Sequence, residues 1–122
     1  MNRTARIWAS QNGTTAVETA LVAPVFIALL FGLLEGAIML WTQLGLQTAT
    51  DRAARCAAID TSRCGTSTLL QNYAAGQALS AKIPASSFTL TSETCGAAVS
   101  GLVKVRFVAT EVTLSARSCF PR

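Results

Sequence analysis

The sequence predicts a membrane-anchored α+β protein with one long N-terminal transmembrane helix, a second short helix and a small antiparallel three-stranded sheet. Three observations predict this class. The run from Thr19 to Leu34 contains no charged residue. All four cysteines, at positions 56, 64, 95 and 119, follow that run. The last third of the chain alternates apolar and polar residues, which is typical of half-buried strands.

The membrane helix is predicted over residues 14–41. From Ala16 to Trp41 the chain is apolar except for Glu18, Glu35 and some glycines. A bilayer core of ~30 Å needs about 20 helical residues, whereas the apolar core of a signal peptide has about 7–15. We therefore expect a retained anchor, kinked at Pro24, which removes one backbone hydrogen bond.

Flanking charges predict the orientation of this helix. Residues 1–13 carry Arg3 and Arg6 and no acidic residue, whereas the far side mixes both signs. Cytoplasmic flanks are enriched in Lys and Arg, and disulfides form in oxidising compartments. The N-terminus is therefore expected in the cytoplasm and the head, residues 42–122, outside it. Trp41 would lie at the outer headgroup layer.

The outer part of the helix contains a candidate packing surface. Gly32 and Gly36 form a G-x-x-x-G pair, which would allow close approach of another helix, although two ordinary membrane glycines fit equally well. Glu35 lies between them, and a carboxylate at this depth is costly without a partner. It either reaches towards the interface or contacts another subunit, and we favour the second interpretation. Homo- or hetero-oligomers would form through this helix.

The helix is expected to continue past Trp41 to about Ile59, because small apolar residues recur at steps of three and four. These residues are Leu46, Ala49, Ala53 and Cys56. The segment from Asp60 to Gly65 breaks the pattern. A second helix is expected from about Thr68 to Ala81, with Ser67 as N-cap. Its expected buried side consists of Leu69, Leu70, Tyr73 and Ala74.

Three strands are predicted near residues 88–91, 103–107 and 112–115, with one long strand over 102–118 as the alternative. A disulfide needs Cα atoms within about 7 Å of each other. A chain reversal near Thr110 brings Cys119 back beside Cys95, which favours three strands. The expected pairs are therefore Cys56–Cys64 and Cys95–Cys119. Zinc is the rival ligand, but no two cysteines have the C-x₂₋₄-C spacing.

Composition argues against several functions. The chain has no histidine, which is the commonest general base and metal ligand. Its net charge of +4 comes from scattered basic residues, so nucleic-acid binding has little support. A C-x₂-C redox motif is absent as well. We expect neither an enzyme nor a bound cofactor or metal.

Gly13 followed by Glu18, with Pro24 inside a long apolar helix, resembles the processing site of type IV prepilins. More closely, residues 16–24 (AVETALVAP) resemble the TadE/TadG pseudopilins of tight-adherence (Flp-type) pilus systems. Residues 31–36, 53–58 and 112–121 continue the resemblance. Thr19 departs from the pattern, because an aromatic residue often follows this glutamate.

The resemblance implies cleavage by a prepilin peptidase between Gly13 and Thr14, with residues 1–13 as a cytoplasmic leader. It also implies that Glu18 acts in recognition or in packing of the mature N-terminus. Cleavage creates an α-ammonium group on Thr14, and Glu18 lies at i+4 on the same helical face. The alternative is an interfacial glutamate that favours the helix dipole.

The expected protein is a pseudopilin-like structural or assembly subunit of a tight-adherence pilus or related secretion apparatus. Its expected location is the bacterial inner membrane, with the head in the periplasm. Its partners would be the lipid bilayer, a prepilin peptidase and other pilin, pseudopilin or Tad assembly subunits. The alternative is a single-pass anchored periplasmic binding or envelope-associated module without a role in filaments.

Overall fold

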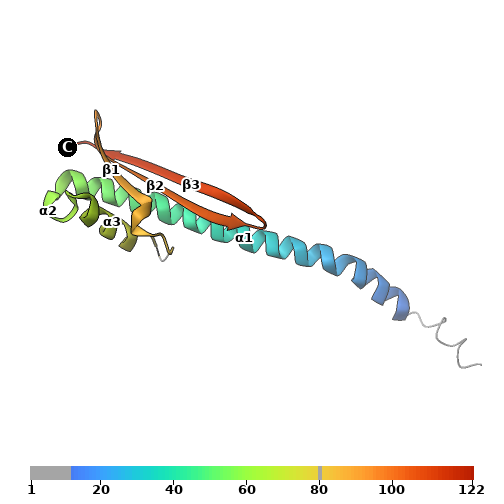
Figure 1. Ribbon diagram of the computed structural model, residues 1–122. Helices are drawn as coiled ribbons and strands as arrows, with labels where there is room; N and C mark the ends of the chain where they lie inside the picture. Colours follow the sequence, from blue (N-terminus) through green and yellow to red (C-terminus); the bar gives the residue numbers. More distant parts are fainter. Residues whose placement is uncertain (1–11, 80) are drawn as a thin grey trace, which may run out of the picture. The chain divides into compact units, whose positions relative to one another are not determined.

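The computed structural model describes residues 12–79 and 81–122 (Figure 1). A long apolar helix, a shorter helix and a three-stranded antiparallel sheet confirm the predicted fold class. The chain forms two compact units, divided between Leu34 and Glu35. The helices are α1 (Asn12–Ile59), α2 (Thr61–Cys64), α3 (Ser67–Gly76) and the 3-10 helix η2 (Ala85–Ser87). The strands are β1 (Phe88–Glu93), β2 (Gly96–Phe107) and β3 (Thr110–Phe120).

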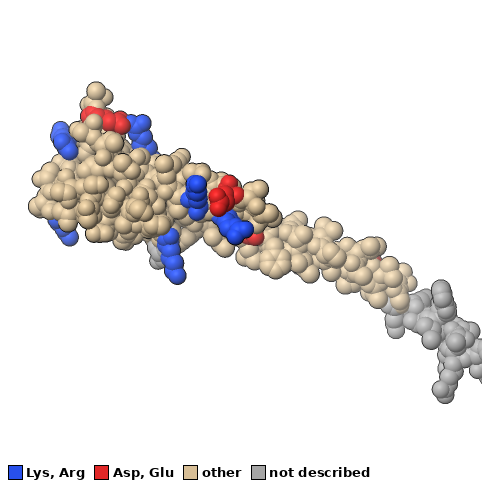
Figure 2. Space-filling view, in the orientation of Figure 1, with Lys and Arg blue, Asp and Glu red and all other residues tan. Residues whose placement is uncertain are grey.

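The first unit consists, in its described part, of the N-terminal half of α1. The helix passes through Pro24 without interruption. It is long and apolar enough to span a membrane, and its apolar side chains are exposed. This segment is almost wholly tan in Figure 2, because Glu18 is its single charged residue before Glu35. Arg3, Arg6 and most of the expected leader lie outside the described residues.

In the second unit, the C-terminal half of α1 is the core of the head. The helix ends at Ile59, as predicted. Leu46, Ala49 and Ala53 are fully buried, and Cys56 is half-buried. Small residues here let the neighbouring chain come close. A Cβ added at Gly45 would lie 2.6 Å from the carbonyl oxygen of Ala78.

The segment between α1 and α3 differs from prediction. One helical turn, α2, occupies most of the predicted break, and the side chain of Asp60 caps it by accepting a hydrogen bond from the amide of Arg63 (3.2 Å). α3 starts at Ser67 rather than being capped by it, and its N-cap Thr66 makes no side-chain cap bond. It ends at Gly76, short of the predicted end.

Two local features account for the shorter α3 and its narrower buried face. Leu79 adopts a left-handed backbone conformation (φ 49°), which an α-helix cannot include. Leu70 and Ala74 are buried as expected, and Tyr73 is half-buried. Leu69 is 45% exposed, so its predicted burial is wrong. The contact between α3 and β1 includes a hydrogen bond from Gln71 Nε2 to the carbonyl of Phe88 (3.0 Å).

The sheet has the order β1-β2-β3, with both pairs antiparallel. The single long strand over residues 102–118 is therefore wrong. The chain reverses at Val108 and Ala109, just before the predicted position at Thr110. The strands are longer than predicted, because β2 and β3 pair from Phe107↔Thr110 to Ala97↔Phe120. Figure 1 shows these strands lying along the C-terminal half of α1.

The four cysteines form the pairs that the sequence favoured. The Cα atoms of Cys56 and Cys64 are 5.7 Å apart, and those of Cys95 and Cys119 are 6.3 Å apart. Both distances lie in the usual range for disulfides. The first bond fastens α2 to the end of α1, and the second joins the β1–β2 turn to the end of β3.

Candidate functional site

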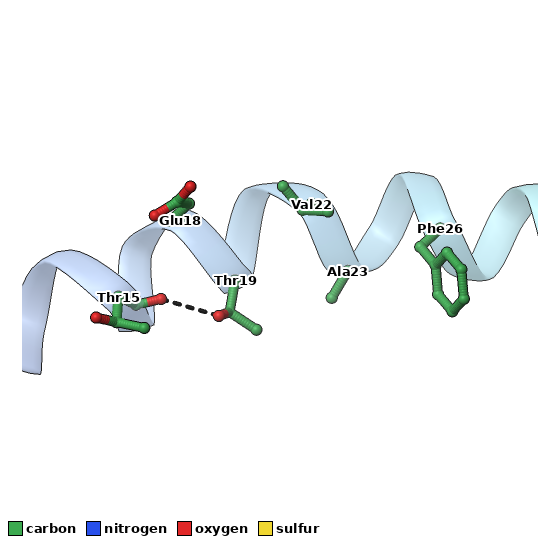
Figure 3. A pocket seen from close by; sticks show the side chains of 6 residues that line it. All are labelled: Thr15, Glu18, Thr19, Val22, Ala23 and Phe26. Atoms are coloured by element: carbon green, nitrogen blue, oxygen red, sulfur yellow. Dashed lines mark hydrogen bonds between the residues drawn. The ribbon is translucent and has the colours of Figure 1, made fainter.

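The first part of the candidate site is the start of α1, shown in Figure 3. Glu18 and Val22 lie one turn apart along one side of the helix, and both are exposed. The hydroxyl of Thr19 donates a hydrogen bond to the backbone carbonyl of Thr15 (2.9 Å). This bond turns the polar group of Thr19 back onto its own helix. Thr19 therefore presents its methyl group outwards.

A shallow, open hollow of about 470 Å³ lies along this segment. Its lining is mostly apolar, and its charged group is Glu18. The lining residues are Thr15, Glu18, Thr19, Val22, Ala23 and Phe26 (Figure 3). Such a surface, apolar with one carboxylate, suits an apolar helix that carries one positive charge.

Glu18 makes no hydrogen bond or ion pair with any of the residues that the structure describes. Gly13 and Thr14 belong to the first turn of α1, which contains no acidic residue. The first amide groups of a helix have no partner within the helix. Thr14 precedes Glu18 by four residues, which places the two on the same helical face.

The proposed packing residues lie on open helix surface. A Cβ added at Gly32 or at Gly36 would meet no atom within 4 Å. Within the described residues, neither glycine is therefore required by the packing of its own chain. Pro24 also lies within exposed helix. These residues leave room for the backbone of another helix, and a contact of this kind stays a prediction.

Glu35 has a partner in its own chain. Its Oε2 atom accepts a hydrogen bond from the backbone amide of Val108 (2.7 Å), at the reversal between β2 and β3. Val108 has a φ of 56°, in the left-handed region that a β-branched residue rarely adopts. A small hollow of about 100 Å³ lies beside this contact, between α1 and β2. The expected contact of Glu35 with another subunit stays a prediction.

The head also carries a basic hollow of about 360 Å³ near the end of α1. Arg52, Arg55 and Arg63 line it together with Asp60 and Tyr73. The hydroxyl of Ser62 donates a hydrogen bond to the Asp60 carboxylate, and this bond is the main cause that lowers the pKa of Asp60. The hollow thus combines three cations with one anion.

The remaining chemistry of the described residues is limited. No group of three or more His, Cys, Asp or Glu side chains among them could hold a metal ion. The four cysteines are all paired, so none is a free thiol. The position of the β2–β3 turn next to Glu35 was not predicted from the sequence. The sequence signal for this unusual turn was the apolar stretch Phe107–Ala109, which contains no glycine or asparagine.

Comparison with known protein families gives one match. Residues 13–55 match a family described as TadE-like protein. The matched segment starts at Gly13 and includes Glu18, Pro24 and Glu35. Searches of curated proteins and of solved structures found no match. Residues 13–55 of this chain are therefore similar to TadE-like proteins.

Proposed function

We propose that this protein is a pseudopilin-like structural or assembly subunit of a tight-adherence (Flp-type) pilus or related secretion apparatus. α1 would anchor it in the bacterial inner membrane, with the N-terminus in the cytoplasm and the head in the periplasm. The observation that carries the proposal is the family match, which falls on the membrane helix and begins at Gly13. The role is structural and includes no catalysis.

In this proposal, a prepilin peptidase hydrolyses the peptide bond between Gly13 and Thr14. Water adds across the bond, so the leader leaves with a carboxylate on Gly13 and the mature chain begins with an ammonium group on Thr14. That ammonium group and the carboxylate of Glu18 both lie at the edge of the hydrocarbon, where an unpaired charge is costly. Glu18 would pair with this group or with that of a neighbouring subunit.

The exposed surface of α1 supports an assembly role. Its apolar side chains face outwards along the first unit, and no described residue covers them. Lipid covers such a surface in a monomer, and other membrane helices replace the lipid in an assembly. Small residues such as Gly32 let helices approach closely, which increases their van der Waals contact. Glu18 adds one specific polar contact to this otherwise apolar surface.

The test is the N-terminus of the purified protein. The full chain is expressed with and without a prepilin peptidase from a tight-adherence system, and its intact mass is measured. We expect a mature chain beginning at Thr14 only when the peptidase is present. Glu18→Ala should reduce the cleaved fraction at least about tenfold, if the carboxylate contributes one charged hydrogen bond to recognition.

The matched control is Glu35→Ala, the same substitution further along the same helix. This variant should be cleaved like the wild type, because Glu35 lies far from the cut in sequence. Chains that keep their leader in the presence of an active peptidase would refute the processing step. Equal cleavage of Glu18→Ala and wild type would remove Glu18 from recognition and leave it a role in packing alone.

The basic hollow favours a second candidate function, an anchored periplasmic module that binds an acidic ligand without a role in filaments. Arg52, Arg55 and Arg63 present guanidinium groups, which suit carboxylates and phosphates. This function requires no processing at Gly13. Retention of pilus assembly by Arg52→Gln and Arg55→Gln variants, together with its loss in Glu18→Ala, would favour the filament role over the binding module.

A further inference from the structure

The turn between β2 and β3 is unusual for a turn exposed to water. Reversals of antiparallel strands in water favour Asn, Asp and Gly, which tolerate left-handed backbone conformations. Here the reversal consists of Val108 and Ala109, and Val108 takes the left-handed conformation. Its side chain is 71% exposed. An apolar, β-branched residue thus occupies an exposed position of the turn.

The hydrogen bond to Glu35 fixes the position of this turn along the axis of α1. The amide of Val108 donates to the Glu35 carboxylate, so the turn lies beside that residue of the helix. The helix remains apolar and exposed beyond this point, at Ile38, Leu40 and Trp41. Trp41 follows Glu35 by six residues, or about 9 Å at 1.5 Å per residue. If Trp41 marks the outer interface of the bilayer, the turn lies at or below that interface.

We propose that the tip of the β2–β3 hairpin, Phe107–Ala109, docks into the headgroup layer of the membrane that α1 spans. The occupant of this surface is the bilayer itself, in the leaflet on the side of the head. The proposal goes beyond the assembly role and rests on the membrane span of α1, with Trp41 at its outer end. It gives the head a second contact with the membrane, besides the helix.

Backbone groups that leave water need hydrogen-bond partners, because each unsatisfied group is costly in an apolar medium. Two such groups at the tip have partners. The Val108 amide donates to Glu35 (2.7 Å), and the carbonyl of Phe107 accepts a hydrogen bond from the hydroxyl of Thr110 (3.1 Å). The same bond also gives the Glu35 carboxylate a donor at a depth where it would otherwise be unpaired. The contact therefore removes two penalties at once.

The charges behind the tip fit an anionic headgroup layer. Lys104 and Arg106 are exposed on β2, two residues apart, and therefore project from the same face of the strand. Long basic side chains place their apolar stems along the membrane and their charged ends among phosphates. Glu111 lies opposite Arg106 in the strand register. An apolar tip with basic residues behind it is the order expected of a membrane-docking loop.

The test measures the depth of the tip with a single tryptophan in the full-length protein. Trp8 and Trp41 are replaced by Phe, and Val108→Trp is introduced. The protein is reconstituted in vesicles of phosphatidylcholine and phosphatidylglycerol, with phosphatidylcholine brominated on its acyl chains. We expect a blue-shifted emission and a loss of fluorescence with the brominated lipid. Ala109→Trp probes the same tip without placing the bulky ring on the left-handed residue.

Two further single-tryptophan variants are the controls. Ile38→Trp reports insertion of α1 and should be quenched. Thr94→Trp, in the β1–β2 turn at the other end of β2, should keep its fluorescence. Quenching of position 38 without quenching at positions 108 and 109 would overturn the proposal and leave the membrane span intact. Absence of quenching at position 38 would overturn both.

A charge variant tests the headgroup contact. Lys104→Gln combined with Arg106→Gln should weaken quenching at position 108 in vesicles that contain phosphatidylglycerol. The matched control changes Lys82 and Arg122 to Gln, which removes the same charge from other exposed positions. If both double variants behave like the unchanged chain, the basic residues have no part in docking. The contact would then be apolar alone, and this part of the proposal would be refuted.

Discussion

Gly101 of β2 packs closely against Leu46 and Thr50 of α1, so Gly101→Ala should loosen the head. An added Cβ would lie 2.7 Å from Cδ1 of Leu46, 3.1 Å from Cγ2 of Thr50 and 3.3 Å from Cε1 of Phe88. All three neighbours are fully buried and cannot move into solvent. Overpacking of this kind costs about 1–3 kcal/mol. The smaller backbone entropy of alanine in the unfolded chain returns about 0.4–1 kcal/mol.

We therefore expect Gly101→Ala to lower the free energy of unfolding by about 1–2 kcal/mol and Tm by roughly 5–15 °C. The assay is thermal unfolding of the full chain in detergent, followed by near-UV circular dichroism from the aromatic residues of the head. Gly76→Ala is the matched control, because a Cβ at this helical position meets no atom within 4 Å. That control should be neutral or slightly stabilising. A Gly101→Ala protein as stable as the wild type would refute the close approach.

Two more predictions concern the two disulfide bonds and the pH dependence of the stability of the head. Replacing both cysteines of Cys95–Cys119 by Ser should cost about 3.5 kcal/mol, against about 2.5 kcal/mol for Cys56–Cys64, because the first bond closes the longer loop; chemical denaturation compares the two. The lowered pKa of Asp60 stabilises the head above the carboxyl pKa of the unfolded chain, and this contribution disappears as the pH falls through the lower folded value. Asp60→Asn should therefore flatten the dependence of Tm on pH below about 4, and an unchanged profile would contradict the assignment.

Much of the fold could be predicted from local patterns. The end of α1 at Ile59 followed from the spacing of small apolar residues, and the disulfide pairs followed from the distance that a bond allows. The full length of β2 did not follow, because Ala97, Ala98 and Val99 are buried in succession and show no alternation. Where side chains on both faces of a strand are buried, apolar residues follow one another and the period-two signal disappears.

Contacts between segments far apart in the sequence could not be predicted from local sequence patterns. The bond between Glu35 and Val108 joins residues 73 positions apart, and nothing in either stretch indicates the other. Gln43 likewise donates a hydrogen bond from Nε2 to the carbonyl of Ser115 (3.0 Å), which fastens β3 to α1. The start of α1 was easier to predict from the sequence, because its residues lie within one continuous helix. Gly13, Thr14 and Glu18 were grouped through the resemblance to prepilins, and their role as a processing site stays a prediction.

The two glutamates of the apolar segment, Glu18 and Glu35, differ in their surroundings. Glu35 was the favoured contact to another subunit, but its carboxylate already accepts a hydrogen bond within its own chain. A neighbouring subunit that used Glu35 would have to displace the Val108 amide or share the carboxylate with it. Glu18 has no such partner among the described residues and lies on exposed helix. Of the two, Glu18 is therefore the carboxylate that gains more from a partner supplied by processing or assembly.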